Sequence, residues 1–348
     1  PFSKLGIEPI GAPRTAATAL EGKLPGKPMF VTTMSWGDPA LLEKSITTGV
    51  PMGMIPEPFT PIAKQAIDNA VVLLKAISND VALAIYVDAK GRPSLVIAAD
   101  VKDEAGAREA MRKISDAIKQ GVEAQQTLSG ANKDAHIGLE WKADGAAISG
   151  GKADRLVLKA PKSMTSELDE IAFLLSNNSL EMLSFVKGGT AVVTMGPNAK
   201  GLAGDVMKGL GKPRKDSLAQ DEGLGRLRRS MGGCQLCSAI DPVQYLRFRL
   251  TMLAAKDKTA AKDAKASLAA LKKAGKVGEP SFGVKVEAKK GALGLVLPKE
   301  TLFADKSAID AVKKAQALVD GDGATSAPPV PVSEKPAGRK PAPKKPAK

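Results

Sequence analysis

Apolar positions along the chain follow two spacings, one typical of helices and one typical of strands. Between Phe59 and Ile77 they recur every three or four residues, which predicts an amphipathic helix. Val81–Asp88 and Leu95–Asp100 are short apolar runs on either side of the turn Lys90–Pro93, a pattern typical of a β-hairpin. Helices and hairpins occur in groups rather than in strict alternation, which favours an α+β fold over a parallel doubly wound sheet.

The same order of elements occurs twice: a strand, a helix that begins at Asp-Pro, a second helix, a hairpin and a third helix. Asp38-Pro39 and Asp241-Pro242 mark the helix starts, because Asp caps free amides and Pro at the first helical position loses no hydrogen bond. We therefore predict antiparallel hairpins with helices on one face, built from a duplicated strand–helix–helix–hairpin–helix unit. The first copy is assigned to Met29–Met34, Ala40–Ile46, Phe59–Ile77, Val81–Asp88, Leu95–Asp100 and Glu104–Ile118, and the second to the run ending at Ile240, Val243–Leu253, Thr259–Lys273, Gly283–Ala288, Leu293–Leu297 and Lys306–Val319.

These patterns divide the chain into five parts. Residues 1–28 are rich in Gly and Pro and are expected to be extended, and the tail 321–348 has so much Pro, Lys and Ala that we expect disorder. The first unit is 29–130, the second copy is 233–320, and a middle α+β segment at 131–232 lies between them. For the middle segment we expect a hairpin of Ile137–Trp141 with Ala146–Gly150, a strand at Arg155–Lys159, a helix at Thr165–Phe185 and a strand at Thr190–Met195.

Charge is the strongest sign of a partner. The chain has 348 residues and a formal net charge of +14, and it contains no apolar run of the ~18–20 residues that a membrane helix needs. Residues 206–231 hold seven Lys/Arg against three acids, and 256–276 hold seven Lys against two Asp. Such segments favour polyanions, but aromatic residues make up only 3% of the chain and no nucleic-acid-binding motif is present, so a solvated basic surface is the competing interpretation. The candidate anion-binding residues are Arg214, Lys215, Arg226, Arg228, Arg229, Lys340, Lys344 and Lys345.

Catalytic patterns are scarce. His136 is the single histidine, which excludes a Ser-His-Asp triad and a histidine-rich metal site. Cys234 and Cys237 form the one Cys-x-x-Cys pair, for which we consider a local disulfide, a thiol oxidoreductase site and two small core residues. Residues 196–201, Gly-Pro-Asn-Ala-Lys-Gly, lack the Lys and Ser/Thr of a phosphate-binding loop and are interpreted as a turn. We therefore predict no enzyme activity, no metal and no cofactor.

Two stretches resemble a known group of proteins. Tyr86–Ile114 (YVDAKGRPSLVIAADVKDEAGAREAMRKI) is similar to uncharacterised bacterial repeat proteins that are often extracytoplasmic and lipid-anchored. Ser217–Met231, followed by a strand and Asp241–Leu246, resembles their next segment, and the likeness extends over most of 29–320. The resemblance implies a non-enzymatic role at the cell envelope, although the basic charge and the Lys-Pro-Ala tail depart from that group.

Three functions from different classes follow. The first is an extracytoplasmic binding or scaffold protein of the periplasm or cell envelope, which contacts another protein or an envelope component and has lost an N-terminal segment before Pro1. The second is a polyanion- or nucleic-acid-binding protein, with a cytoplasmic location as the alternative. The third is a thiol oxidoreductase at Cys234 and Cys237. The sequence indicates neither the ligand nor the oligomeric state.

Overall fold

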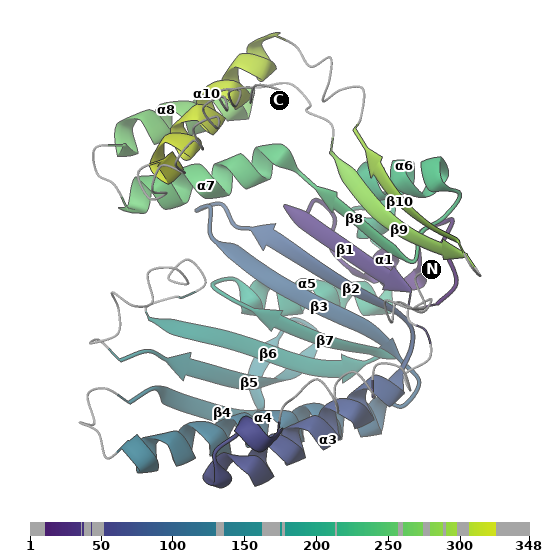
Figure 1. Cartoon of the computed structure of the whole chain (residues 1–348), viewed down its shortest axis with the longest axis vertical. Helices are drawn as coiled ribbons and strands as arrows, with labels where there is room; N and C mark the ends of the chain where they lie inside the picture. Colours follow the sequence, from purple (N-terminus) through teal and green to yellow (C-terminus); the bar gives the residue numbers. More distant parts are fainter. Residues whose placement is uncertain are drawn as a thin grey trace, which may run out of the picture.

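A single ten-stranded antiparallel sheet forms the centre of the molecule (Figure 1). The computed structural model describes residues 11–35, 37, 43, 52–129, 136–161, 175, 178–212, 214–256, 260–273, 279–287, 290–297 and 306–324. The predicted α+β class is confirmed. Helices lie on both faces of the sheet and not on one, so that part of the prediction is corrected.

The strands follow the order β10-β9-β8-β1-β2-β3-β7-β6-β5-β4 across the sheet. Their bounds are β1 Phe30–Ser35, β2 Ile77–Val87, β3 Pro93–Val101, β4 Gly138–Ile148, β5 Gly151–Lys159, β6 Ser179–Lys187, β7 Thr190–Met195, β8 Leu236–Ile240, β9 Ser281–Glu287 and β10 Lys290–Val296. The α-helices are α1 Ala19–Lys23, α3 Thr60–Ala76, α4 Glu104–Ser129, α5 Ala199–Gly211, α6 Glu222–Met231, α7 Pro242–Lys256, α8 Ala261–Lys273 and α10 Lys306–Ala324, and the 3-10 helices are η2 Met52–Met54, η3 Glu57–Phe59 and η7 Leu218–Gln220.

The described elements of the two predicted copies differ by one helix, because the first predicted helix of the first copy lies mostly outside the described residues. The first runs β1, α3, β2, β3 and α4, and the second runs β8, α7, α8, β9, β10 and α10. Their first strands are neighbours in the sheet and antiparallel, with Phe30 opposite Ile240. Asp241 caps α7 as expected, since its Oδ1 accepts from the backbone N–H of Val243 and Gln244 at 2.9 and 3.0 Å. The helix predicted at 40–46 lies outside the described residues except for Glu43, which is helical.

The middle segment differs from the prediction in two places. The expected hairpin of 137–141 with 146–150 is instead the single strand β4, whose pairing with β5 is irregular between Lys142 and Ala146. The end of the helix predicted at 165–185 is the strand β6, which is paired on both sides, with β5 and β7. Pairing with the preceding and the following strand overrides the local helical spacing there.

The main core lies on the face of the sheet covered by α1, α5 and α6. Leu202 and Val206 of α5 pack there against Val192 of β7. Leu20 and Leu24 from the N-terminal region are buried in the same cluster, and Ala19–Lys23 form the short helix α1, so part of the region expected to be extended is helical and packs in the core.

The opposite face carries two separate helix groups. α3 packs against β2, and α4 packs against β4, β6 and β7 of the middle segment, through a cluster that includes Ala107 and Met111. α7, α8 and α10 pack mainly on one another around Leu250 and Ala315 (Figure 1). α10 continues to Ala324, so the first four residues of the predicted tail are helical, and 325–348 lie outside the described residues. None of the helices described has the length and apolar character to cross a membrane.

Candidate functional site

Four large apolar side chains are exposed at one edge of the sheet. Leu293 and Leu295 of β10 are 82% and 70% exposed, Phe282 of β9 is 46% exposed, and Leu297, just beyond β10, is 49% exposed. We call these four residues the β9–β10 surface. Exposed leucines in such a group are unusual for a protein surface and are typical of interaction sites.

The pleat of the two strands explains why these side chains are exposed. Gly283 and Gly294 lie against α6, where the space for a side chain is taken by Met231. Successive side chains of a strand point to opposite faces, so Phe282, Leu293 and Leu295 point away from α6. One face of the hairpin is therefore held by α6, while the other presents apolar side chains to solvent.

The outer side of β10 is also open. β10 is the last strand in the sheet order and, among the residues that the structure describes, pairs with β9 alone, so half of its backbone N–H and C=O groups have no described strand beside them. The stretch Gly291–Val296 contains no charged residue. An apolar edge strand of this kind is a template for pairing with another strand.

The opposite edge, β4, is protected by features that β10 lacks. Its pairing is irregular between Lys142 and Ala146, and Asp144 within that irregularity has a positive φ of 51°. The Asp144 N–H donates to Asp154 Oδ1 at 2.7 Å, and Glu140 forms an ion pair with Lys159 across the strand. Bulges and charges of this kind discourage strand addition.

The two cysteines lie at the start of β8. Cys234 and Cys237 are joined by a disulfide, with their Cα atoms 5.8 Å apart, and both side chains are buried. Cys234 also exchanges two backbone hydrogen bonds with Arg14, at 2.9 and 3.2 Å. A buried disulfide of this kind is inaccessible to a protein substrate unless the N-terminal region moves away.

The predicted anion-binding residues do not form one surface. Arg228 is only 3% exposed, and both of its terminal nitrogens donate to Glu21, so its assignment as an anion-binding residue is corrected. Arg214 is partly buried and pairs with Asp216 at 3.1 Å. Lys215 and Arg229 are exposed, Arg226 lies 3.9 Å from Glu222, and Lys340, Lys344 and Lys345 lie outside the described residues.

A buried polar network attaches the N-terminal region to the sheet. Arg14 Nε donates to Asp80 Oδ1 at 3.0 Å, and Lys23 Nζ donates to Asp100 Oδ1 at 3.3 Å and to Thr190 Oγ1 at 2.8 Å. Burial raises the pKa of Asp80, while the neighbouring Arg14 opposes that rise. A cavity of about 480 Å³ lies between Asp80, Asp100 and residues 13–19. Because two cations balance two carboxylates, the network needs no charged ligand and serves to hold the N-terminal region in place.

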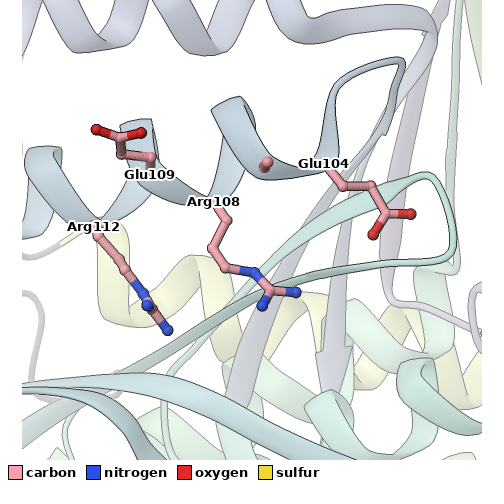
Figure 2. Close-up of a pocket in the computed structure, with 5 residues that line it drawn as sticks. Glu104, Arg108, Glu109 and Arg112 are labelled. Atoms are coloured by element: carbon pink, nitrogen blue, oxygen red, sulfur yellow. The ribbon is translucent and has the colours of Figure 1, made fainter.

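A second cavity, of about 440 Å³, lies along α4. Arg108 and Arg112 point from the same side of the helix toward the strands (Figure 2). Arg112 Nε and Nη2 donate to Asp154 at 2.8 and 2.9 Å, and Arg108 Nη2 donates to the Val186 carbonyl at 2.5 Å. Glu104 and Glu109 line the same cavity. The guanidinium groups of Arg108 and Arg112 therefore already have partners within the protein, so this cavity does not favour the binding of an anion.

An acidic cluster lies beside the start of β9. Asp221 and Asp241 are the N-caps of α6 and α7, and burial raises the pKa of each carboxyl. Burial, together with these two carboxylates, raises the pKa of Glu279 to about 7, and Arg226 lowers it slightly. Neither this cluster nor any other group of His, Cys, Asp or Glu side chains in the described part of the chain has the arrangement to hold a metal ion.

Sequence reasoning identified β10 as a strand but missed its exposed edge. The signal available was the stretch Gly291–Val296, which alternates small and large apolar residues without a charge. Whether such a strand is central or at an edge depends on pairings across the whole sheet.

No family model, no curated protein and no solved structure matched this chain.

Proposed function

We propose that this chain is a non-enzymatic binding or scaffold protein that acts through protein–protein contacts at the β9–β10 surface. The observation that carries the proposal is the coincidence of exposed Leu293 and Leu295 with a strand edge that has no charged residue from Gly291 to Val296 and no further described strand beside it. Exposed apolar groups cost free energy in water, and burying them against a partner recovers about 25 cal/mol per Å².

The disulfide supports an extracytoplasmic location for this function. Cys234 and Cys237 are paired, and disulfides persist mainly in oxidising compartments such as the periplasm or the cell surface. This agrees with the envelope role that the sequence resemblance implies, and we include that location in the proposal.

Polyanion binding is the weaker candidate. The burial of Arg228 and the pairing of Arg214 with Asp216 remove two members of the basic group on which it depended. The remaining charge gives nonspecific attraction, which weakens steeply as salt is raised.

A photo-crosslinking residue tests the proposal. Placed at Leu295 in the full chain and expressed in its native cells, it should form a discrete adduct with a protein, identified by mass spectrometry. The matched control is Ala147, exposed on the protected strand β4, which should give no such adduct. The Leu295 adduct should disappear when Leu293→Ser is added.

Two results would contradict the proposal. One is an adduct pattern at Leu295 that is indistinguishable from that at Ala147. The other is submicromolar DNA binding at 150 mM salt, measured by fluorescence anisotropy and unaffected by Leu293→Ser, which would favour the polyanion alternative.

A further inference from the structure

We infer that β10 binds an extended, apolar segment of an acidic partner protein as an added antiparallel strand. This inference rests on the proposed function and specifies how the partner binds. It follows from a comparison of β10 with β3, the strand that occupies the same place in the first copy.

In the first copy the outer strand is not at an edge. β3 pairs antiparallel with β7, from Leu95 opposite Met195 to Asp100 opposite Thr190. β7 belongs to the middle segment, and no strand in the described part of the chain takes the corresponding place next to β10. Within the described residues, the fold therefore supplies a neighbouring strand to β3 and leaves the equivalent side of β10 without one.

The neighbour that β3 has indicates the chemistry of the missing strand. β7 reads Thr-Ala-Val-Val-Thr-Met, which is β-branched and apolar and has no charge. Ile97 of β3, directly opposite Val193, is 37% exposed, whereas Leu293 of β10 is 82% exposed. A strand like β7 beside β10 would bring the exposure of the leucines towards that of Ile97, because side chains on neighbouring strands cover each other.

The net charge of the second copy indicates which residues should flank the added strand in the partner. Segment 233–320 holds sixteen Lys/Arg against nine Asp/Glu, a net +7, whereas 29–130 holds ten against twelve, a net −2. A partner that approaches β10 meets the basic copy, so acidic residues on either side of its apolar strand are favoured. A second copy of this chain fits less well, because two chains of charge +14 repel each other.

A synthetic peptide tests the mode of binding in the full chain. The probe is a fluorescent peptide that carries the β7 sequence, TAVVTM, between two aspartates at each end. It should bind the chain, and amide hydrogen exchange of residues 290–296 should slow at least tenfold on binding, because an added strand takes up the outward-facing amides. Leu293→Ser/Leu295→Ser should weaken binding at least tenfold, and both positions are exposed, so the variant should unfold at the unchanged temperature.

Two control peptides separate strand addition from other contacts. The same peptide with N-methyl groups on its six central residues keeps its side chains but loses its backbone donors, and should bind at least tenfold more weakly. Lysines in place of the aspartates should weaken binding at least fivefold at 50 mM salt.

The failures of the two proposals are distinguishable. Equal binding of the N-methylated peptide, or no binding of the aspartate peptide alongside a Leu295-dependent protein adduct in cells, would overturn strand addition while protein binding stands. A dimer in sedimentation equilibrium that Leu295→Lys converts to a monomer would also overturn the inference, because the occupant of β10 would then be a second copy.

Discussion

The segments 29–130 and 233–320, which the sequence predicts to be copies of one unit, differ in the neighbours of their outer strands. In the first, β3 is covered by β7 and the helices α3 and α4 pack over the sheet. In the second, β10 ends the sheet and α7, α8 and α10 pack mainly on one another. The outer strand of segment 29–130 thus lies inside the sheet. The outer strand of segment 233–320, which is the more basic of the two, lies at the edge of the sheet.

The difference arises from what lies next to each copy. The middle segment supplies β7 to the first copy alone, and the sheet continues from there to the protected edge β4. In the described part of the chain, α6 is the helix that packs on the strands of the second copy. A strand becomes buried or exposed according to its neighbours, even when its own sequence is similarly apolar.

The largest effect is expected where the two copies are joined. α1 packs against β2 and β3, α6 packs against β8, β9 and β10, and the buried pair Glu21–Arg228 connects the two helices. Arg228→Met should lower the free energy of unfolding by about 3–5 kcal/mol, because it leaves Glu21 buried without its partner. Urea unfolding measures the loss.

The control for that prediction is the next residue of the same helix. Arg229 is exposed, so Arg229→Met should stay within about 0.5 kcal/mol of the parent. The double change Glu21→Leu/Arg228→Met should recover most of the lost stability. A loss below about 1 kcal/mol for Arg228→Met would show that the pair does not join the copies.

A smaller effect compares the two outer strands directly. Val96 of β3 is fully buried, so Val96→Ala should lower the free energy of unfolding by about 2 kcal/mol. Leu293→Ala in β10 removes more carbon but should change it by less than about 0.5 kcal/mol, because that side chain is exposed. Similar losses in both variants, measured by urea unfolding, would mean that β10 is covered.

Local structure was largely predictable from the sequence. β7 has the predicted bounds, Thr190–Met195, and Asp241 caps α7 as its Asp-Pro start indicated. Both depend on residues close in the chain, namely a short apolar run and a side chain next to free amides. The predicted helix that ended at Phe185 failed because pairing of β6 with the preceding strand β5 and the following strand β7 outweighs local helical spacing.

The roles of charged residues were not predictable. Arg228 lies in a basic stretch and was assigned to the surface, but its partner Glu21 is 207 residues away. Likewise, the Gly- and Pro-rich N-terminal region was expected to be extended, yet Leu20 and Leu24 are buried in the main core. Contacts at such separations leave no local pattern, and the open edge of β10 was missed for the same reason.

The smallest effect concerns a carboxyl group present in the second copy alone. Glu279 lies two residues before β9, whereas the corresponding position before β2 is Lys75. Its pKa of about 7 in the folded chain lies above the ordinary value of 4.5, so the folded state holds its proton more tightly than the unfolded state. The resulting stabilisation is complete below pH 4.5 and is lost as pH rises through about 7.

Between pH 5 and pH 8, the free energy of unfolding of Glu279→Gln should therefore rise by about 1 kcal/mol relative to that of the parent, as measured by urea unfolding. This value is reduced for partial exposure of the side chain to solvent. Asp263→Asn, at an exposed site on α8, should follow the parent at each pH. Parallel curves for Glu279→Gln and the parent would show that burial and the neighbouring Asp221 and Asp241 do not hold Glu279 protonated.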